Sequence, residues 1–113
     1  MEFKITEQGG VGVLSVEGEL DALTSPELTR FFDAQVSDRY VNVILDLEHL
    51  SYSSSAGIRI FLGLARTARS RGGDLRIAAV QSQVNKIFKL SKFDKIVQIY
   101  STVDEAVQSF EKE

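Results

Sequence analysis

The chain has 113 residues, of which 43% are hydrophobic and 26% are charged, and its net charge at pH 7 is −3. Length and composition predict a single globular domain spanning residues 1–113, and the acidic balance argues against nucleic acid as a direct partner. The absence of cysteine, the single histidine and the lack of a signal-like or membrane-length apolar run favour a cytoplasmic protein with no disulfide, metal site, cofactor or membrane insertion.

A hairpin followed by a helix is expected in the first forty residues. Residues 3–6 alternate between apolar and polar, Gly9-Gly10 suits a tight turn, and the run 11–16 provides a more apolar partner strand. The segment 18–21 is then expected to leave the sheet. Ser25-Pro26 predicts a helix start, with the serine as cap and the proline in the first turn. The apolar face of this helix consists of Leu28, Phe31, Phe32 and Val36.

The rest of the chain alternates between strands and helices. The nearly all-apolar run 41–47 predicts a central strand that is covered on both faces. The further expected elements are a helix with the stripe Ile58, Phe61, Leu62, Ala65 and Ala68, a strand at 75–80, a short helix capped by Ser82, a strand at 96–100, and a helix that follows a Thr102–Glu105 capping box. This order predicts a single α/β domain. Its mostly parallel sheet has about five strands and an N-terminal antiparallel hairpin, and is packed with four helices.

Three consecutive serines, Ser53, Ser54 and Ser55, lie between the central strand and the helix that follows it. The first N–H groups of a helix have no partner within it and the dipole there is positive, so this position suits an anion or a modified hydroxyl. Three interpretations are open: a cap by Ser54 or Ser55, a nucleophile, or a phosphorylation switch. A nucleophile would have only His49 as an imidazole base and no G-x-S-x-G turn, so we do not expect an enzyme or a catalytic residue.

The residues around this cluster form a longer pattern. The apolar strand ends in Asp46-Leu47, Tyr52 follows in the loop, and Ser55-Ala56-Gly57-Ile58 begins the helix. Together with Gly18-Glu19-Leu20-Asp21, this arrangement resembles the STAS domain family, in particular its bacterial anti-sigma factor antagonists, over essentially the whole chain. We expect Tyr52 to pack beneath the loop as an apolar anchor.

The resemblance implies a binding protein controlled by phosphorylation, and its implications are stated here as expectations. Unphosphorylated, the protein would bind an anti-sigma factor that is also a serine-protein kinase of the histidine-kinase-like ATPase fold, and so free a sigma factor. The kinase would phosphorylate Ser55, with Ser54 and Ser53 as alternatives, and a metal-dependent serine phosphatase would restore the hydroxyl. The implied partner-binding residues are Glu19, Asp21, Ser54, Ala56, Gly57, Ile58 and Arg59.

Two positions depart from the family pattern. Ser54 stands where the family usually has an aspartate, which keeps open an alternative function as an unphosphorylated STAS docking subunit of a membrane transporter or larger signalling assembly. Arg59 stands where a small residue is common. It lies one helical turn after Ser55, and either pairs with a phosphate there or is a solvated arginine. A third hypothesis, a small-ligand or nucleotide-binding domain, lacks a glycine-rich phosphate loop with a lysine.

Overall fold

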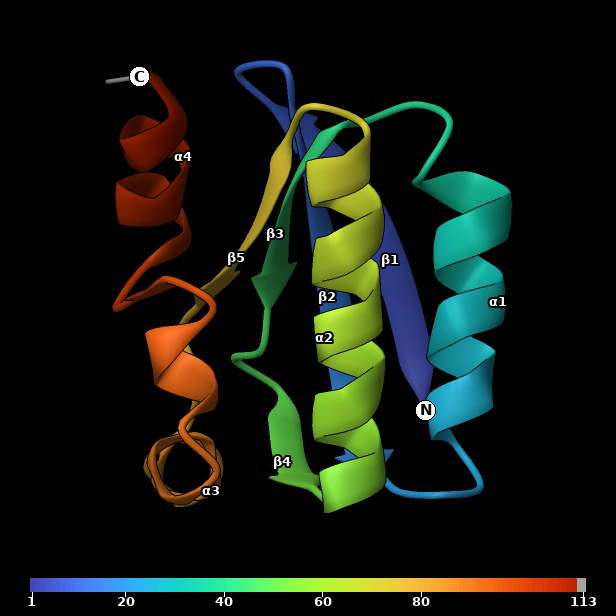
Figure 1. The fold of residues 1–113 in the computed structure, drawn as a ribbon, viewed down its shortest axis with the longest axis vertical. Coiled ribbons are helices and arrows are strands. Elements are labelled where there is room, and N and C mark those ends of the chain that lie inside the picture. Colours follow the sequence, from blue (N-terminus) through green and yellow to red (C-terminus); the bar gives the residue numbers. More distant parts are fainter. Residues whose placement is uncertain (112–113) are drawn as a thin grey trace.

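The computed structural model describes residues 1–111, which form one mixed sheet and four α-helices (Figure 1). The strands are β1 (Glu2–Gln8), β2 (Val11–Leu20), β3 (Asn42–Asp46), β4 (Leu50–Ser53), β5 (Asp74–Ala78) and β6 (Ile99–Tyr100). The helices are α1 (Ser25–Gln35), α2 (Ser55–Ser70), α3 (Ser82–Leu90) and α4 (Val103–Glu111), and a 3-10 turn, η1 (Phe93–Lys95), follows α3. The predicted α/β class and the order of its elements are confirmed, with β4 as an additional strand.

The sheet is antiparallel only at its first pair. Its strands follow the order β1-β2-β3-β5-β6, and β4 pairs with β2. In the β1–β2 hairpin Gln8 lies opposite Val11, and both residues of the Gly9-Gly10 turn have positive φ, which glycine adopts without a steric penalty. The other pairings in the sheet are parallel. Each of the parallel neighbours β2–β3, β3–β5 and β5–β6 is joined by a connection that includes a helix, as parallel crossovers require.

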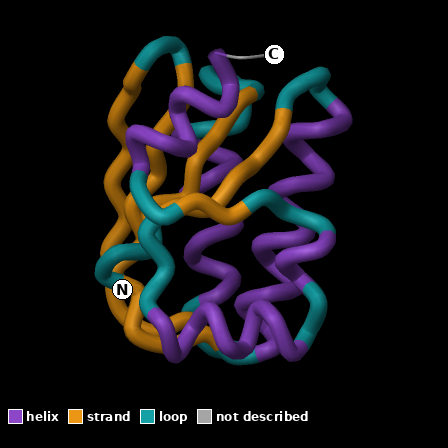
Figure 2. Tube along the Cα trace, turned by 90° about the vertical axis from the view of Figure 1, so that its left-hand side faces the viewer, coloured by secondary structure: helices purple, strands orange, loops and turns teal. Residues whose placement is uncertain are grey.

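Helices cover both faces of the sheet. α1 and α2 pack against each other in front of the strands in Figure 1, whereas α4 packs against β3, β5 and β6. Residues of β3 alternate between these layers: Val43 and Leu45 belong to the large core beneath α1 and α2, and Ile44 packs with Ala106 and Val107 of α4. α3 lies across the end of the domain, at the bottom of Figures 1 and 2, and contacts β4.

Aromatic side chains join α2 to α3 and η1. Phe61, Phe88 and Phe93 are almost completely buried, and their ring centroids lie 4.7–6.1 Å apart. Contacts of this kind add to the free energy gained from burial alone.

Within the described residues, no helix is both long enough and apolar enough to cross a membrane.

Four details of the predicted elements are wrong. The strand expected at 75–80 ends at Ala78, because Ala79 adopts a left-handed backbone with φ 60°. Residues 18–20 do not leave the sheet but extend β2, because β4 supplies a partner there. The last strand begins at Ile99 instead of residue 96, since the preceding residues form η1 and its C-terminal cap. On α2 the buried stripe includes Leu64, which lies three residues from Phe61, while Leu62 lies at the edge of the stripe and is only partly buried.

The predicted helix caps have mixed outcomes. Ser25 and Ser82 are the first residues within α1 and α3 and not the residues that precede these helices, and no side-chain cap bond forms at either start. The loop before α1 is organised instead by other side chains, described below. Before α4 the predicted cap is confirmed, because the Glu105 N–H donates to the Thr102 hydroxyl at 3.1 Å.

Candidate functional site

The serine cluster lies at the junction of β4 and α2. Pairing of β2 with β4 places Leu20 opposite Ser53, and the Ser54 N–H donates to the Leu20 carbonyl oxygen at 2.8 Å. These contacts bring segments 18–21 and 53–59, which are distant in sequence, onto one end of the domain. The two groups of residues that the resemblance implied are therefore neighbours in space.

The three serines differ in their surroundings. Ser53 is fully buried, and its hydroxyl donates to the Ser54 carbonyl oxygen at 3.1 Å. Ser54 precedes α2 with extended backbone (φ −81°, ψ 175°), but its hydroxyl oxygen is buried and has no hydrogen-bond partner among residues 1–111, so the predicted side-chain cap is wrong. Ser55 is the first residue of α2 and is exposed. Of the three hydroxyls, that of Ser55 is the one that solvent and a second protein can reach.

The start of α2 approaches the sheet closely at Gly57. A Cβ on this residue would overlap the Ser53 hydroxyl oxygen and lie 2.7 Å from Leu20 Cδ2. The next residue, Ile58, is only 6% exposed and belongs to the large core. Gly57 and Ile58 therefore hold α2 against the sheet and present little surface to a partner, whereas Ala56 is partly exposed.

Asp21 organises the loop between β2 and α1. Its Oδ1 accepts the N–H groups of Thr24 at 3.0 Å and Leu23 at 2.9 Å. These bonds, that from Thr24 first, lower the pKa of the Asp21 carboxyl below 3.8 because they favour its charged form. The Thr24 hydroxyl in turn donates to the carbonyl oxygen of Glu19. Glu19 is exposed and lies opposite Tyr52 of β4. Asp21 thus shapes the surface on which Glu19 is presented.

Two large apolar side chains flank this end of the domain. Leu23 is 86% exposed and Tyr52 is 45% exposed. The prediction that Tyr52 packs beneath the loop is wrong, because the inward positions of β4 are its two ends, Leu50 and Ser53. Sequence reasoning missed Leu23, although a leucine inside a short polar turn is an available signal. Exposed apolar groups beside charged ones are typical of a protein-binding surface.

Arg59 and Ser55 are four residues apart on α2 and therefore lie on the same side of the helix. Arg59 is exposed and lines a hollow of about 300 Å³ between α1 and α2, which Asp33 of α1 also lines. In the part of the chain that the structure describes, neither Arg59 nor Ser55 has a side-chain hydrogen bond or ion pair, and His49 forms no hydrogen bond to the three serines. The geometry suits a serine that another protein modifies.

Comparison with known proteins yields one family. Residues 2–106 match the model of the STAS domain. BtrV of Bordetella bronchiseptica, named as a candidate anti-sigma factor antagonist, is 27% identical over 110 residues, which are 97% of this chain and 95% of that protein. An anti-sigma F factor antagonist of Paenibacillus polymyxa is 25% identical over 112 residues, which are 98% of this chain and 96% of that protein.

Solved structures agree on the fold. An anti-sigma factor antagonist from Mycobacterium paratuberculosis matches with a TM-score of 0.85 and 26% identity over 96% of this chain and 92% of that chain. SpoIIAA, an anti-sigma factor antagonist, matches in its unphosphorylated form with a TM-score of 0.77 over 99% of this chain and 98% of that one. Its phosphorylated form matches with a TM-score of 0.69 over 96% of this chain and 99% of that one. Both forms are 21% identical to this chain, so they inform the fold alone.

Proposed function

The chain belongs to the STAS domain family, and we propose that it is an anti-sigma factor antagonist whose binding is switched by phosphorylation of Ser55. In its unphosphorylated form it binds an anti-sigma factor that is also a serine-protein kinase of the histidine-kinase-like ATPase fold, and this frees the sigma factor. A metal-dependent serine phosphatase reverses the modification. The relatives named as anti-sigma factor antagonists support this role over nearly their full length.

The observation that carries the proposal is the accessibility of Ser55. A kinase must reach the hydroxyl and place it in its own active site, which a buried serine does not allow. Ser53 is fully buried and the Ser54 hydroxyl oxygen is buried too, whereas Ser55 is exposed at the first position of α2. This difference favours Ser55 over the two alternatives.

The position also explains how a phosphate could act without refolding the domain. At the first residue of α2 the helix dipole and free N–H groups favour negative charge, so the phosphorylated protein remains stable. In a packed interface the same phosphate would lose its hydration and lie near other charges, and both effects weaken binding. A loss of about 3 kcal/mol in binding free energy weakens affinity more than a hundredfold.

The surface around Ser55 suits a protein partner. Glu19, Leu23, Tyr52 and Arg59 are all exposed there, so that charged and apolar groups are interspersed. Glu19 and Tyr52 face each other across the β2–β4 pair. We infer that these four side chains contact the anti-sigma factor, in place of the inward-facing Gly57 and Ile58.

Phosphopeptide mapping of the protein purified from its own cells tests the switch. The proposal predicts a phosphate on Ser55 that a metal-dependent serine phosphatase removes. A phosphate on Ser53 or Ser54 instead would contradict the accessibility argument. No phosphate in any growth condition would favour the docking-subunit alternative, which the serine at position 54 keeps open since the family usually has an aspartate there.

A further inference from the structure

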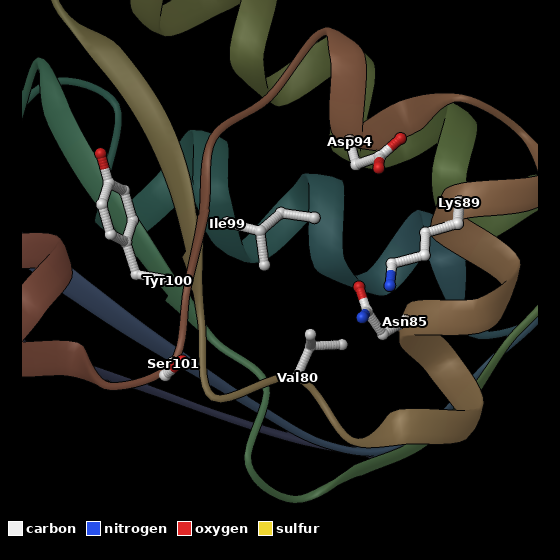
Figure 3. A pocket seen from close by; sticks show the side chains of 7 residues that line it. All are labelled: Val80, Asn85, Lys89, Asp94, Ile99, Tyr100 and Ser101. Carbon is white, nitrogen blue, oxygen red and sulfur yellow. The ribbon is translucent and has the colours of Figure 1, made fainter.

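A groove lies at the carboxyl ends of β5 and β6. Its volume is about 440 Å³, which is within the range of small-molecule sites. In parallel sheets this edge is where ligands commonly bind. The residues that line it come from the loop after β5, from α3, from η1 and from β6 with the residue that follows it: Val80, Asn85, Lys89, Asp94, Ile99, Tyr100 and Ser101 (Figure 3).

The groove contains one cation and one anion that do not pair with each other. In Figure 3 the Lys89 amine and the Asn85 amide, both from α3, point into the groove, and Asp94 of η1 lies above them. Within residues 1–111, Lys89 and Asp94 form no ion pair and no side-chain hydrogen bond. Both charges are therefore available to a ligand, and each would oppose a group of its own sign.

Apolar surface adjoins these charges. The side chains of Val80 and Ile99 point into the groove, whereas the ring of Tyr100 points to the other side of β6 (Figure 3). Val80 follows Ala79, which has a left-handed backbone with φ 60° and whose N–H donates to the Tyr100 carbonyl oxygen at 3.1 Å. This hydrogen bond joins the turn after β5 to β6. It therefore fixes the backbone next to Val80 relative to the backbone next to Ile99.

We propose that the groove binds an α-amino acid with an apolar side chain. The carboxylate of the ligand binds the Lys89 ammonium and the Asn85 amide N–H, its ammonium binds the Asp94 carboxylate, and its side chain packs on Val80 and Ile99. A simple carboxylic acid would face Asp94 without a compensating cation, and a simple amine would face Lys89. The site shares no residue with the surface around Ser55, so it does not depend on the proposed function.

A titration with L-leucine, followed by amide chemical shifts of the isotope-labelled protein, tests the site. We expect saturable shifts at Asn85, Lys89 and Ile99. Isocaproate, which lacks the ammonium group, and isoamylamine, which lacks the carboxylate, should each bind at least about tenfold more weakly. Isocaproate binding as tightly as leucine would overturn the proposal and indicate a site for simple anions, and the absence of saturable shifts would overturn it altogether.

Three variants locate the binding. Lys89→Met and Asp94→Asn each remove one charge with little change in size, and each should weaken leucine binding at least about fivefold. Lys86→Met removes an exposed lysine of the same helix that does not line the groove, and should leave the affinity unchanged. Equal losses in Lys86→Met and Lys89→Met would show that only the general positive charge of α3 matters, and would overturn the assigned contacts.

Discussion

Gly57 of α2 packs directly on Ser53 of β4, so closely that a methyl group at position 57 would overlap the Ser53 hydroxyl oxygen. The same methyl group would lie 2.7 Å from Leu20 Cδ2, and both Ser53 and Leu20 are fully buried. This contact draws the first turn of α2 onto the junction of β2 and β4. The outward position of Ser55 thus depends on the absence of a side chain at Gly57, two residues later.

Gly57→Ala is expected to destabilise the fold. Adding a methyl group to a packed core costs about 1–3 kcal/mol, which outweighs the gain of up to about 1 kcal/mol from the helix propensity of alanine. Gly63→Ala on the same helix is the matched control, because an added Cβ there meets no atom within 4 Å. It should stabilise the protein by about 0.5–1 kcal/mol. Urea unfolding measures both free energies, and a Gly57→Ala protein as stable as the Gly63→Ala protein would show that the junction has room to adjust.

Ser55→Asp and Ser55→Ala are expected to differ in binding and not in folding. Because Ser55 is exposed at a helix start, both variants should retain the wild-type unfolding free energy within about 0.5 kcal/mol. Calorimetry with the cognate anti-sigma factor should show near wild-type affinity for Ser55→Ala and a loss of about a hundredfold for Ser55→Asp. Indistinguishable affinities of the two variants would refute the switch.

Arg59→Ala is expected to lower the folding stability of the phosphorylated protein only. If the guanidinium pairs with a phosphate on Ser55 one turn earlier, its removal should lower the unfolding free energy of that form by about 0.5–1 kcal/mol. The unphosphorylated form should be unchanged, since Arg59 has no side-chain partner within residues 1–111. Thermal melting of both forms measures this, with Arg66→Ala, an exposed arginine further along α2, as the control. Equal losses in the two forms would exclude the pairing.

Asp21→Asn is expected to make the protein less sensitive to acid. The hydrogen bonds from Thr24 and Leu23 hold the pKa of the Asp21 carboxyl below its ordinary 3.8, so the folded protein binds this proton less readily than the unfolded chain. Its stabilising contribution is complete above the unfolded value and is lost as the pH falls through the lower folded value. Unfolding free energies at about pH 7 and about pH 3 should therefore differ less in Asp21→Asn than in the wild type.

Asp33→Asn controls for the loss of one carboxylate. Asp33 is exposed, and its side chain accepts no hydrogen bond from the rest of the described chain. The Asp33→Asn variant should therefore retain the wild-type difference in unfolding free energy between the two pH values. Identical behaviour of the two variants would mean that net charge, and not the loop around Asp21, sets the acid sensitivity.

Much of the architecture could be predicted from local patterns. The alternation in residues 3–6 and the apolar run 41–47 report burial on one face and on both faces of a sheet, and the helical spacing along α2 reports a single buried stripe. The short strand β4 could not be found this way. Its apolar–polar alternation, Leu-Ser-Tyr-Ser, covers only four residues, and the burial of its two ends, Leu50 and Ser53, does not follow that alternation but depends on pairing with β2.

The sequence by itself determined the α/β class, the order of the helices and strands, the resemblance to STAS domains and the location of the serine cluster before α2. Only the tertiary structure decided which hydroxyl faces solvent, that Tyr52 and Leu23 are exposed, and that Gly57 and Ile58 face inward. The reason is physical. Periodicity depends on neighbours along the chain, whereas the exposure of three adjacent serines depends on β2, β4 and α2 meeting at one point.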